Sequence, residues 1–459
     1  MGSPITLSGF NNIDFNVILD AIMQQERVPL VALEQQQSSL NARSAEFADL
    51  ATRLATLGTA VDDLDDAAAF GGRAVTNSDD TAVAVAATSA TPLGTYDIVV
   101  NELARAQVTG SNSSHADKDT TIVASGGSLT IGGTAVTIGG DVTLEGLRDA
   151  INATTDIGVT ASIVSPSIGS YQLVLTGKST GSANAFTITN ALTGGTEPLG
   201  FLDFDLDGQS GDSVEDNAVQ ATNASATVNN ITVTSSTNVL DSAIPGATLT
   251  LLKKDPATTI TIGVSQDVQT TKDRITTFVT AYNDLVDFFN TQVQAAAAGN
   301  QSSLGRDALM RGLRTTLTTM LNSQYAVGGS YDVLAEIGIE FEQDGTLSFD
   351  TTAFDEAIAT GTTDVEKLFV GSGGTDGAFT ALANTIQDYT EAGGLIPDAQ
   401  SRLDDQVSAL STRIAAYEER LALRRVALQK EFAAADLAIQ QLNGQSGPLS
   451  ALGGQYRLF

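Results

Sequence analysis

The sequence predicts an α+β protein of several domains. Paired coiled-coil helices form its ends, a mixed helical and β core domain follows, and two nested antiparallel β domains are inserted between the paired ends. Three observations predict this fold class: an apolar residue recurs every seven positions near each end, the apolar period falls to two between about 74 and 271, and helical spacing returns afterwards. We infer that the ends pair and the middle is an insertion, as in a subunit of an assembly.

The N-terminal repeat predicts one long helix preceded by a short one. Its heptad positions are Leu33, Leu40, Phe47, Leu54 and Val61, with Leu50, Leu57 and Leu64 interleaved. We expect the short helix from Asp14 to Gln25. Pro29 should interrupt it and suit the first turn of the long helix, which should run to about Ala69, before Gly71-Gly72.

The middle of the chain is rich in threonine, serine, valine, glycine and asparagine, and it predicts short strands between turns. The clearest strand segments are 82–86, 96–100, 171–175 and 259–262. One helix is expected from Thr143 to Ala153. The length of this region is enough for two small antiparallel β domains, one nested within the other.

Helical spacing returns after about residue 271 and continues to the C-terminal region. We expect helices at about 273–294, 307–322, 351–359, 376–392 and 397–442. Asp344-Gly345 predicts a tight hairpin between strands at 339–342 and 346–349, because this pair supplies the positive φ that the turn needs. In the last helix the heptad positions are Val407, Ile414, Leu421, Leu428, Ala435 and Leu442, with Leu403, Leu410 and Tyr417 interleaved.

These patterns define an expected domain division and an expected assembly seam. The divisions are terminal helical legs (1–42 with 403–459), a helical core domain (43–75 with 272–402), an inner β domain (76–116 with 217–271) and a variable outer β domain (117–216). The assembly seam comprises Leu33, Leu40, Phe47, Leu54, Val407, Leu410, Ile414, Leu421, Leu428 and Leu442. An ordinary buried helical core is the alternative interpretation of the same stripes. Gln36, Arg43, Arg424 and Glu431 interrupt the stripes, and such polar residues can set register and partner number.

The composition argues against several classes of partner. Lysine and arginine number 23 against 54 acidic residues, a formal net charge of −31, so nucleic acid and anionic membrane surfaces are disfavoured. The chain has no cysteine, and no apolar run is long enough to suggest a membrane span. The first thirty residues do not resemble a cleaved secretory signal. A cysteine-free chain suits a protein that travels unfolded and refolds outside the cell.

Two polar clusters are candidates for chemical sites. His115, the only histidine, follows a run of serine and asparagine and is expected to be a solvated loop residue, so no catalytic residues and no cofactor are expected. Asp203, Asp205 and Asp207 alternate before Gly208, as in a loop that wraps oxygen ligands around calcium. The twelfth position from Asp203 is a valine, so the alternative interpretation is an acidic solvated turn.

Several strings, in order along nearly the whole chain, resemble the family of the flagellar filament cap protein, hook-associated protein 2. Each string alone is weak, but their order and separations make the resemblance specific; the poorly matched part is about 110–220. The strings are Ser8-Gly9-Phe10, residues 26–30, 93–104, 237–241, 245–249 and 278–283, Ile337-Gly338-Ile339, Gly345-Thr346-Leu347, residues 368–371, Glu431-Phe432-Ala433 and Gln441-Leu442-Asn443.

The resemblance implies a non-enzymatic structural role. Family members form a small ring, described as a pentamer, at the growing tip of the filament, with the terminal helices as legs and the β domains as a plate. It further implies export through the flagellar channel, an extracellular location at the distal tip, and flagellin, hook-associated junction proteins and an export chaperone as partners. The alternatives are a flagellin-like or hook–filament junction protein, or a calcium-binding surface adhesin.

Overall fold

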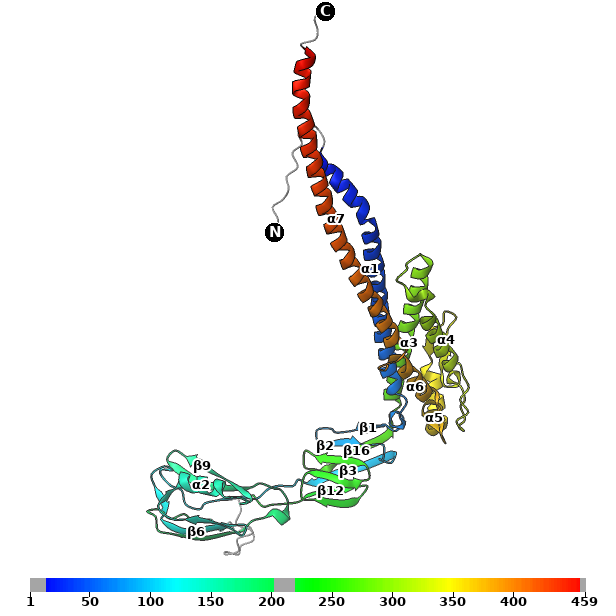
Figure 1. Cartoon of the computed structure of the whole chain (residues 1–459). Coiled ribbons are helices and arrows are strands. Elements are labelled where there is room, and N and C mark those ends of the chain that lie inside the picture. Colours follow the sequence, from blue (N-terminus) through cyan, green and yellow to red (C-terminus); the bar gives the residue numbers. More distant parts are fainter. Residues whose placement is uncertain (1–13, 202–218, 455–459) are drawn as a thin grey trace, which may run out of the picture. The chain divides into compact units, whose positions relative to one another are not determined.

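A computed structural model describes residues 14–201 and 219–454, with side chains as far as residue 442. The chain divides into two compact units, residues 1–70 with 269–459 and residues 71–268. The first unit is mainly helical and brings the two ends of the chain together, and the second is built from antiparallel sheets (Figure 1). The predicted fold class is therefore confirmed.

The N-terminal helix α1 is continuous from Phe15 to Asp62. Asp14 caps it, because its carboxylate accepts hydrogen bonds from the backbone N–H groups of the next turn. The expected break at Pro29 is wrong. Met23 and Leu30, on either side of the proline, are buried among apolar residues of the C-terminal helix, and this packing holds the helix together despite the lost backbone hydrogen bond. Beyond Asp62 only the short 3₁₀ helix η1 (Ala67–Ala69) follows.

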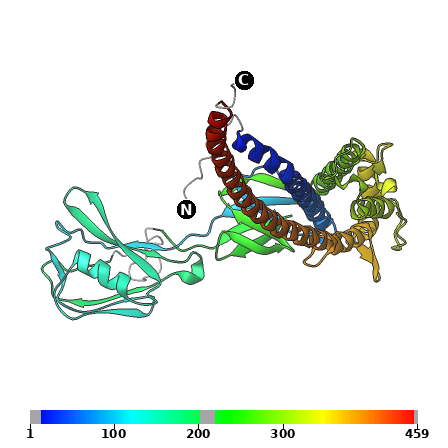
Figure 2. The same cartoon turned by 45° about the horizontal axis from the view of Figure 1, so that its top comes forward.

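The C-terminal helix α7 runs from Leu395 to Gly454, antiparallel to α1. As residue numbers rise along α1, those of the contacting residues in α7 fall, from Phe15 with Phe432 to Gln37 with Ser411. Figures 1 and 2 show the two helices side by side. The long helical ends that the heptads predicted therefore form a helical hairpin.

The rest of the first unit packs against the lower part of this hairpin. Its helices are α3 (Val268–Ala297), α4 (Ala308–Leu321), α5 (Thr351–Val370) and α6 (Ala378–Thr390), with 3₁₀ turns η3 (Leu304–Arg306) and η4 (Leu334–Ile337). The predicted hairpin is present as β17 (Ile339–Phe341) and β18 (Leu347–Phe349), and a small ladder joins β19 (Gly371–Ser372) to β20 (Thr375–Asp376). Helix α5 is longer than expected because helical backbone resumes after a kink at Gly361.

Aromatic rings fill the centre of this helical core. Phe369 stacks on Phe379 with ring centroids 4.4 Å apart, and Phe278 and Phe70 meet these two rings edge-on at 4.7 and 5.0 Å. All four are buried. Edge-on and offset contacts between buried rings add to the stabilisation from burial alone, so they fix how α3, α5 and α6 pack.

The second unit contains two separate apolar cores. Around the first lie a five-stranded sheet in the order β1-β16-β3-β12-β13 and a three-stranded sheet in the order β14-β15-β2. The strands are β1 (Arg73–Asn77), β2 (Val83–Ala87), β3 (Gly94–Glu102), β12 (Ala224–Val228), β13 (Ile231–Ser235), β14 (Val239–Ile244), β15 (Ala247–Leu251) and β16 (Asp255–Gln266). Asn229 and Asn230 both have positive φ and make the tight turn between β12 and β13.

The second core is formed by residues between 108 and 201. Its sheets have the orders β4-β10-β9, β11-β6-β7 and β5-β8, and helix α2 (Leu144–Ala153) buries Leu144, Leu147 and Ile151 in the same core. The strands are β4 (Val108–Gly110), β5 (Ile122–Ala124), β6 (Gly126–Ile131), β7 (Thr134–Ile138), β8 (Val142–Thr143), β9 (Val159–Ser167), β10 (Ser170–Gly177) and β11 (Ile188–Thr193), with the 3₁₀ turn η2 (Ser182–Asn184). Between the two cores, the strand segment that leads into the second core pairs with the segment that leads back, at Arg105 with Thr222 and at Val108 with Val219.

Candidate functional site

The upper part of the helical hairpin, residues 15–42 of α1 with 403–442 of α7, forms a two-helix leg. An inner seam of five buried residues joins its helices: Leu19, Met23, Leu30, Leu421 and Leu428. Ile22, Ile414, Tyr417 and Phe432 pack against this seam, and Phe15 stacks on Phe432 with ring centroids 5.5 Å apart. Because most of the stability of a helix in a protein comes from packing of its apolar face, this burial stabilises the leg.

Polar contacts flank the inner seam and set its register. Arg424 lies 3.2 Å from the carboxylate of Glu26, Arg425 lies 3.2 Å from that of Asp20, and Gln37 donates to Ser411. All are at least partly exposed, and exposed ion pairs contribute only about 0–1 kcal/mol each. The ion pairs therefore specify alignment, while the apolar seam supplies most of the stabilisation.

The residues of the expected assembly seam differ in burial. Phe47, Leu54, Leu410, Leu421 and Leu428 are buried, and Leu33, Leu40, Val407 and Ile414 are half-buried. Leu442 is 66% exposed. Burial within one chain does not test a role in assembly, which stays a prediction.

Sequence reasoning missed the N-terminal half of the inner seam. Leu19, Met23 and Leu30 are spaced by four and seven residues, which is the spacing of one helical face. The signal was hidden by the expectation that Pro29 ends a helix, since a break there would remove Leu30 from that face.

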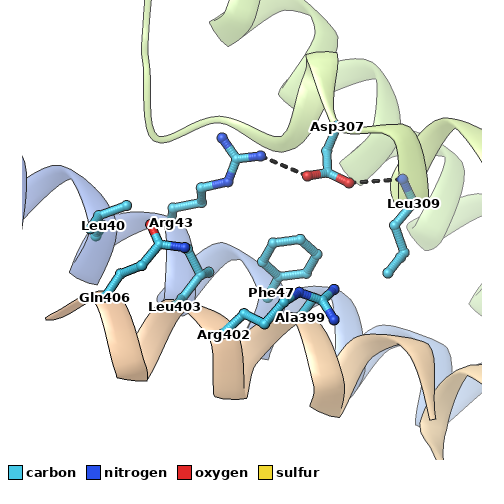
Figure 3. Close-up of a pocket in the computed structure, with 9 residues that line it drawn as sticks. All are labelled: Leu40, Arg43, Phe47, Asp307, Leu309, Ala399, Arg402, Leu403 and Gln406. Carbon is cyan, nitrogen blue, oxygen red and sulfur yellow. Dashed lines mark hydrogen bonds and ion pairs between the residues drawn. The ribbon is translucent and has the colours of Figure 1, made fainter. Parts of the chain in front are cut away.

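A pocket of about 270 Å³ lies at the base of the leg, where α1, α7 and the start of α4 meet. It is lined by Leu40, Arg43, Phe47, Asp307, Leu309, Ala399, Arg402, Leu403 and Gln406. Figure 3 shows Arg43 extending from α1 to Asp307, while Arg402, Leu403 and Gln406 come from α7. The pocket therefore marks the point where the helical core gives way to the two-helix leg.

Asp307 links two of the elements that line the pocket, α1 and the start of α4. One carboxylate oxygen accepts from Arg43 Nη2 at 2.6 Å, and the other accepts from the backbone N–H of Leu309 at 2.8 Å, which caps α4. Nearby, Gln292 of α3 donates to Glu46 of α1 and accepts from the backbone N–H of Leu304. Arg43, which interrupts the heptad pattern, thus has an ionic partner in the helical core.

His115 is buried, so the expectation of a solvated loop residue is wrong. Its backbone N–H and C=O pair with those of Tyr171 in β10, at 2.8 Å each, and its side chain is buried. Nδ1 lies 3.2 Å from a carboxylate oxygen of Glu197, and Nε2 lies 3.4 Å from Ser113 Oγ. The ring thus links the 111–115 segment to the loop around residue 197.

The expected calcium loop, Asp203, Asp205 and Asp207, lies outside the described residues. Within residues 14–201 and 219–454, no three histidine, cysteine or acidic side chains are grouped so that they could hold a metal ion. In the same part of the chain, no helix has both the length and the apolar content that a membrane crossing requires.

The chain matches known proteins over nearly its whole length. The family model described as flagellar hook-associated protein 2 C-terminus matches residues 221–444, and the corresponding N-terminus model matches residues 11–107. The A-type flagellar hook-associated protein 2 of Pseudomonas aeruginosa is 30% identical, over 98% of this chain and 97% of its own length. Flagellar hook-associated protein 2 of Escherichia coli K12 is also 30% identical, over 98% of each.

A solved structure supports the same relation. The D1-D2-D3 domains of the flagellar cap protein FliD from Escherichia coli match with a TM-score of 0.61 and 29% identity, covering 78% of this chain and 99% of that one. Together with the helical hairpin, this likeness places the chain among the structural proteins of the bacterial flagellum. Within that class, the chain belongs to the flagellar hook-associated protein 2 family.

Proposed function

We propose that this protein forms a ring at the distal tip of the bacterial flagellar filament and guides exported flagellin subunits into place. The observation that carries the proposal is the leg: an antiparallel helical hairpin made from the two ends of the chain, in a protein that matches a solved cap protein. A long hairpin can reach along a filament axis. The role is structural and requires no covalent chemistry.

The proposed parts of the cap follow the expected domain division. Residues 1–42 with 403–459 act as legs, 43–75 with 272–402 as the core domain, and 76–116 with 217–271 as the inner β domain. Residues 117–216 form the variable outer domain. The two separate apolar cores of the β unit support the division between the last two parts.

The proposed partners are further copies of this chain in a ring of five, flagellin, the hook-associated junction proteins and an export chaperone. The proposed location is extracellular, after export through the flagellar channel. Mass photometry of the purified protein tests the ring, and we expect one species at five times the protomer mass. A different closed multiple would correct the subunit number without removing the cap.

Deletion of the gene in the source species tests the function. We expect hooks without filaments, loss of swimming, and monomeric flagellin released into the medium. A version lacking Ala399 to Phe459 should fail to restore swimming, because it has lost one leg helix, whereas replacement of residues 117–216 should be tolerated better. Normal filaments in the deletion strain would show that the protein is not the filament cap.

A further inference from the structure

Each helix of the leg carries a second apolar stripe that faces away from the inner seam. In α1 this outer stripe comprises Val17, Val28 and Val31, and in α7 it comprises Leu423, Val426 and Leu437; all six are exposed, from 41% for Val31 to 66% for Leu423. At 3.6 residues per turn the members of each stripe fall within one narrow face, on the side of the helix roughly opposite the seam residues. A solvent-facing helix has no need of such a stripe.

The two outer stripes match one another in antiparallel register. Val17 and Val31 are fourteen positions apart, as are Leu423 and Leu437, which is about 21 Å along a helix. In each stripe the middle member lies three residues from one end and eleven from the other. An antiparallel alignment that places Val31 opposite Leu423 therefore also places Val28 opposite Val426, and Val17 opposite Leu437. The separations of three and eleven residues are sums of the alternating three- and four-residue steps of a coiled-coil seam.

The positions between these residues match as well. The six layers of this register are Gln35–Glu419, Val31–Leu423, Val28–Val426, Gln24–Lys430, Ala21–Ala433 and Val17–Leu437. Three layers are apolar, one pairs two small residues, and two set a glutamine against a charged side chain. In-register pairing of two α7 helices would instead place Lys430 on Lys430 and Glu419 on Glu419, and like charges in a seam repel.

The occupant of each outer stripe is therefore a second copy of this chain. Within one chain the stripes lie on opposite sides of the hairpin, so they cannot meet each other. We propose that α7 of one copy packs its outer stripe against the α1 outer stripe of the next. Copies whose legs point the same way bring these helices together antiparallel, and such a head-to-tail contact can close into a ring. The contact between copies is independent of the proposed function; only the closure of these contacts into a ring rests on the proposed role as a filament cap.

Disulfide trapping tests the contact, and the chain helps because it has no cysteine of its own. Val28→Cys protein mixed with Val426→Cys protein should give a cross-linked dimer under mild oxidation, in at least about tenfold higher yield than either protein alone. Glu431→Cys, exposed on a different face of α7, is the matched control and should not cross-link to Val28→Cys. Circular dichroism of each cysteine variant should match the wild type and verifies that the hairpin is intact, because its helices depend on packing against one another.

Charge changes in the Gln24–Lys430 layer provide a second test, in which reversing the charge at residue 430 should reverse the effect of a charge at residue 24. With Lys430 in place, Gln24→Glu should raise the yield of the mixed cross-link and Gln24→Lys should lower it. In a Lys430→Glu background this order should reverse, because the sign of the opposing charge has reversed. An unchanged order, a Val28–Val28 product in place of the mixed one, or no product with an intact hairpin would overturn the contact.

The cap function has a separate readout. Variants that fail to cross-link but restore filaments and swimming would overturn the proposed leg contact and leave the cap in place. Efficient cross-linking in a protein whose deletion leaves filaments normal would retain the contact and remove the cap function.

Discussion

At the scale of single residues, Asp307 connects two helices of the helical unit, α1 and α4. It binds Arg43 of α1 and caps α4 at the rim of the pocket at the base of the leg. An N-cap carboxylate contributes typically about 1 kcal/mol, and the partly buried pair with Arg43 adds to this.

Replacement of this aspartate should therefore have two separable effects. We expect Asp307→Ala to lower the free energy of unfolding by about 1–2 kcal/mol, because both cap and ion pair are lost. Asp307→Asn keeps the cap and should cost less, close to the effect of Arg43→Ala. Urea denaturation of the three variants measures this. Equal losses for Asp307→Ala and Asp307→Asn would show that the cap contributes nothing.

Asp65 provides a pH-dependent prediction. Partial burial raises its pKa above the usual 3.8, and the neighbouring carboxylates of Asp62 and Asp66 raise it further. The folded state then binds the proton more tightly than the unfolded chain does. The free energy of unfolding therefore falls as pH rises from the unfolded pKa, about 3.8, through the higher pKa of the folded state. We expect Asp65→Asn to raise Tm at pH 7 and the gain to shrink as pH falls toward 3.8.

Asp344 serves as a control of opposite sign. Hydrogen bonds from the Thr346 hydroxyl and backbone N–H lower the pKa of this carboxyl group. Its contribution is present above the unfolded pKa and is lost as pH falls through the lower folded value. Asp344→Asn should therefore lower Tm at pH 7 and lose its effect in acid. The same sign for both variants would contradict the assigned causes.

The Asp203 loop is tested by calorimetry. If Asp203, Asp205 and Asp207 bind calcium, titration into the wild type should release or absorb heat that Asp205→Ala lacks, because one oxygen ligand is gone. Absence of heat from the wild type at millimolar calcium would remove the site and the main support for a calcium-binding adhesin.

At the scale of elements, the leg depends on one narrow apolar contact between two helices. Leu421 lies in the inner seam, whereas Leu423, two residues later, lies in the outer stripe. The two leucines therefore separate formation of the hairpin from association between copies.

We expect Leu421→Asp to open the hairpin and impair assembly, with an effect of several kcal/mol in order of magnitude, because a carboxylate enters an apolar seam. The β unit, with its own cores, should melt as before. Circular dichroism and the size distribution of the assembly measure both. Leu423→Asp should impair assembly alone, and unchanged rings in Leu421→Asp would show that assembly does not depend on the inner seam.

At the scale of the whole molecule, the two ends of the chain form one leg, and little else of the chain packs against it. The leg is two helices wide and exposes an apolar stripe on each. The formal net charge of −31 opposes crowding of copies, so contacts between legs must outweigh this repulsion. Such a structure is expected to be dynamic in the free protomer.

Hydrogen exchange should reveal this difference. We expect fast exchange before residue 42 and after residue 402 in the protomer, and slowed exchange in the assembled cap, because assembly covers the exposed stripes. The helical core, with its buried aromatic rings, should be protected in both states and serves as the internal control. Strong and equal protection of the ends in a verified monomer would contradict the prediction.

Local patterns in the sequence were sufficient for the fold class. Heptads predicted the long terminal helices, period-two segments predicted strands such as β10, and Asp344-Gly345 predicted the β17–β18 hairpin. These features follow from the geometry of one element, which neighbouring residues in the sequence already specify. The ordered strings were also sufficient to identify the family, because they are spread along nearly the whole chain.

The tertiary structure alone decided what depends on distant residues. Pro29 remains inside α1 because residues of α7, about four hundred positions away, bury Met23 and Leu30 beside it. His115 is buried where its segment pairs with β10, some sixty residues later, and Arg43 pairs with Asp307 across the helical unit. No local period encodes such meetings, because burial and ion pairing are set by which surfaces come together when the chain folds.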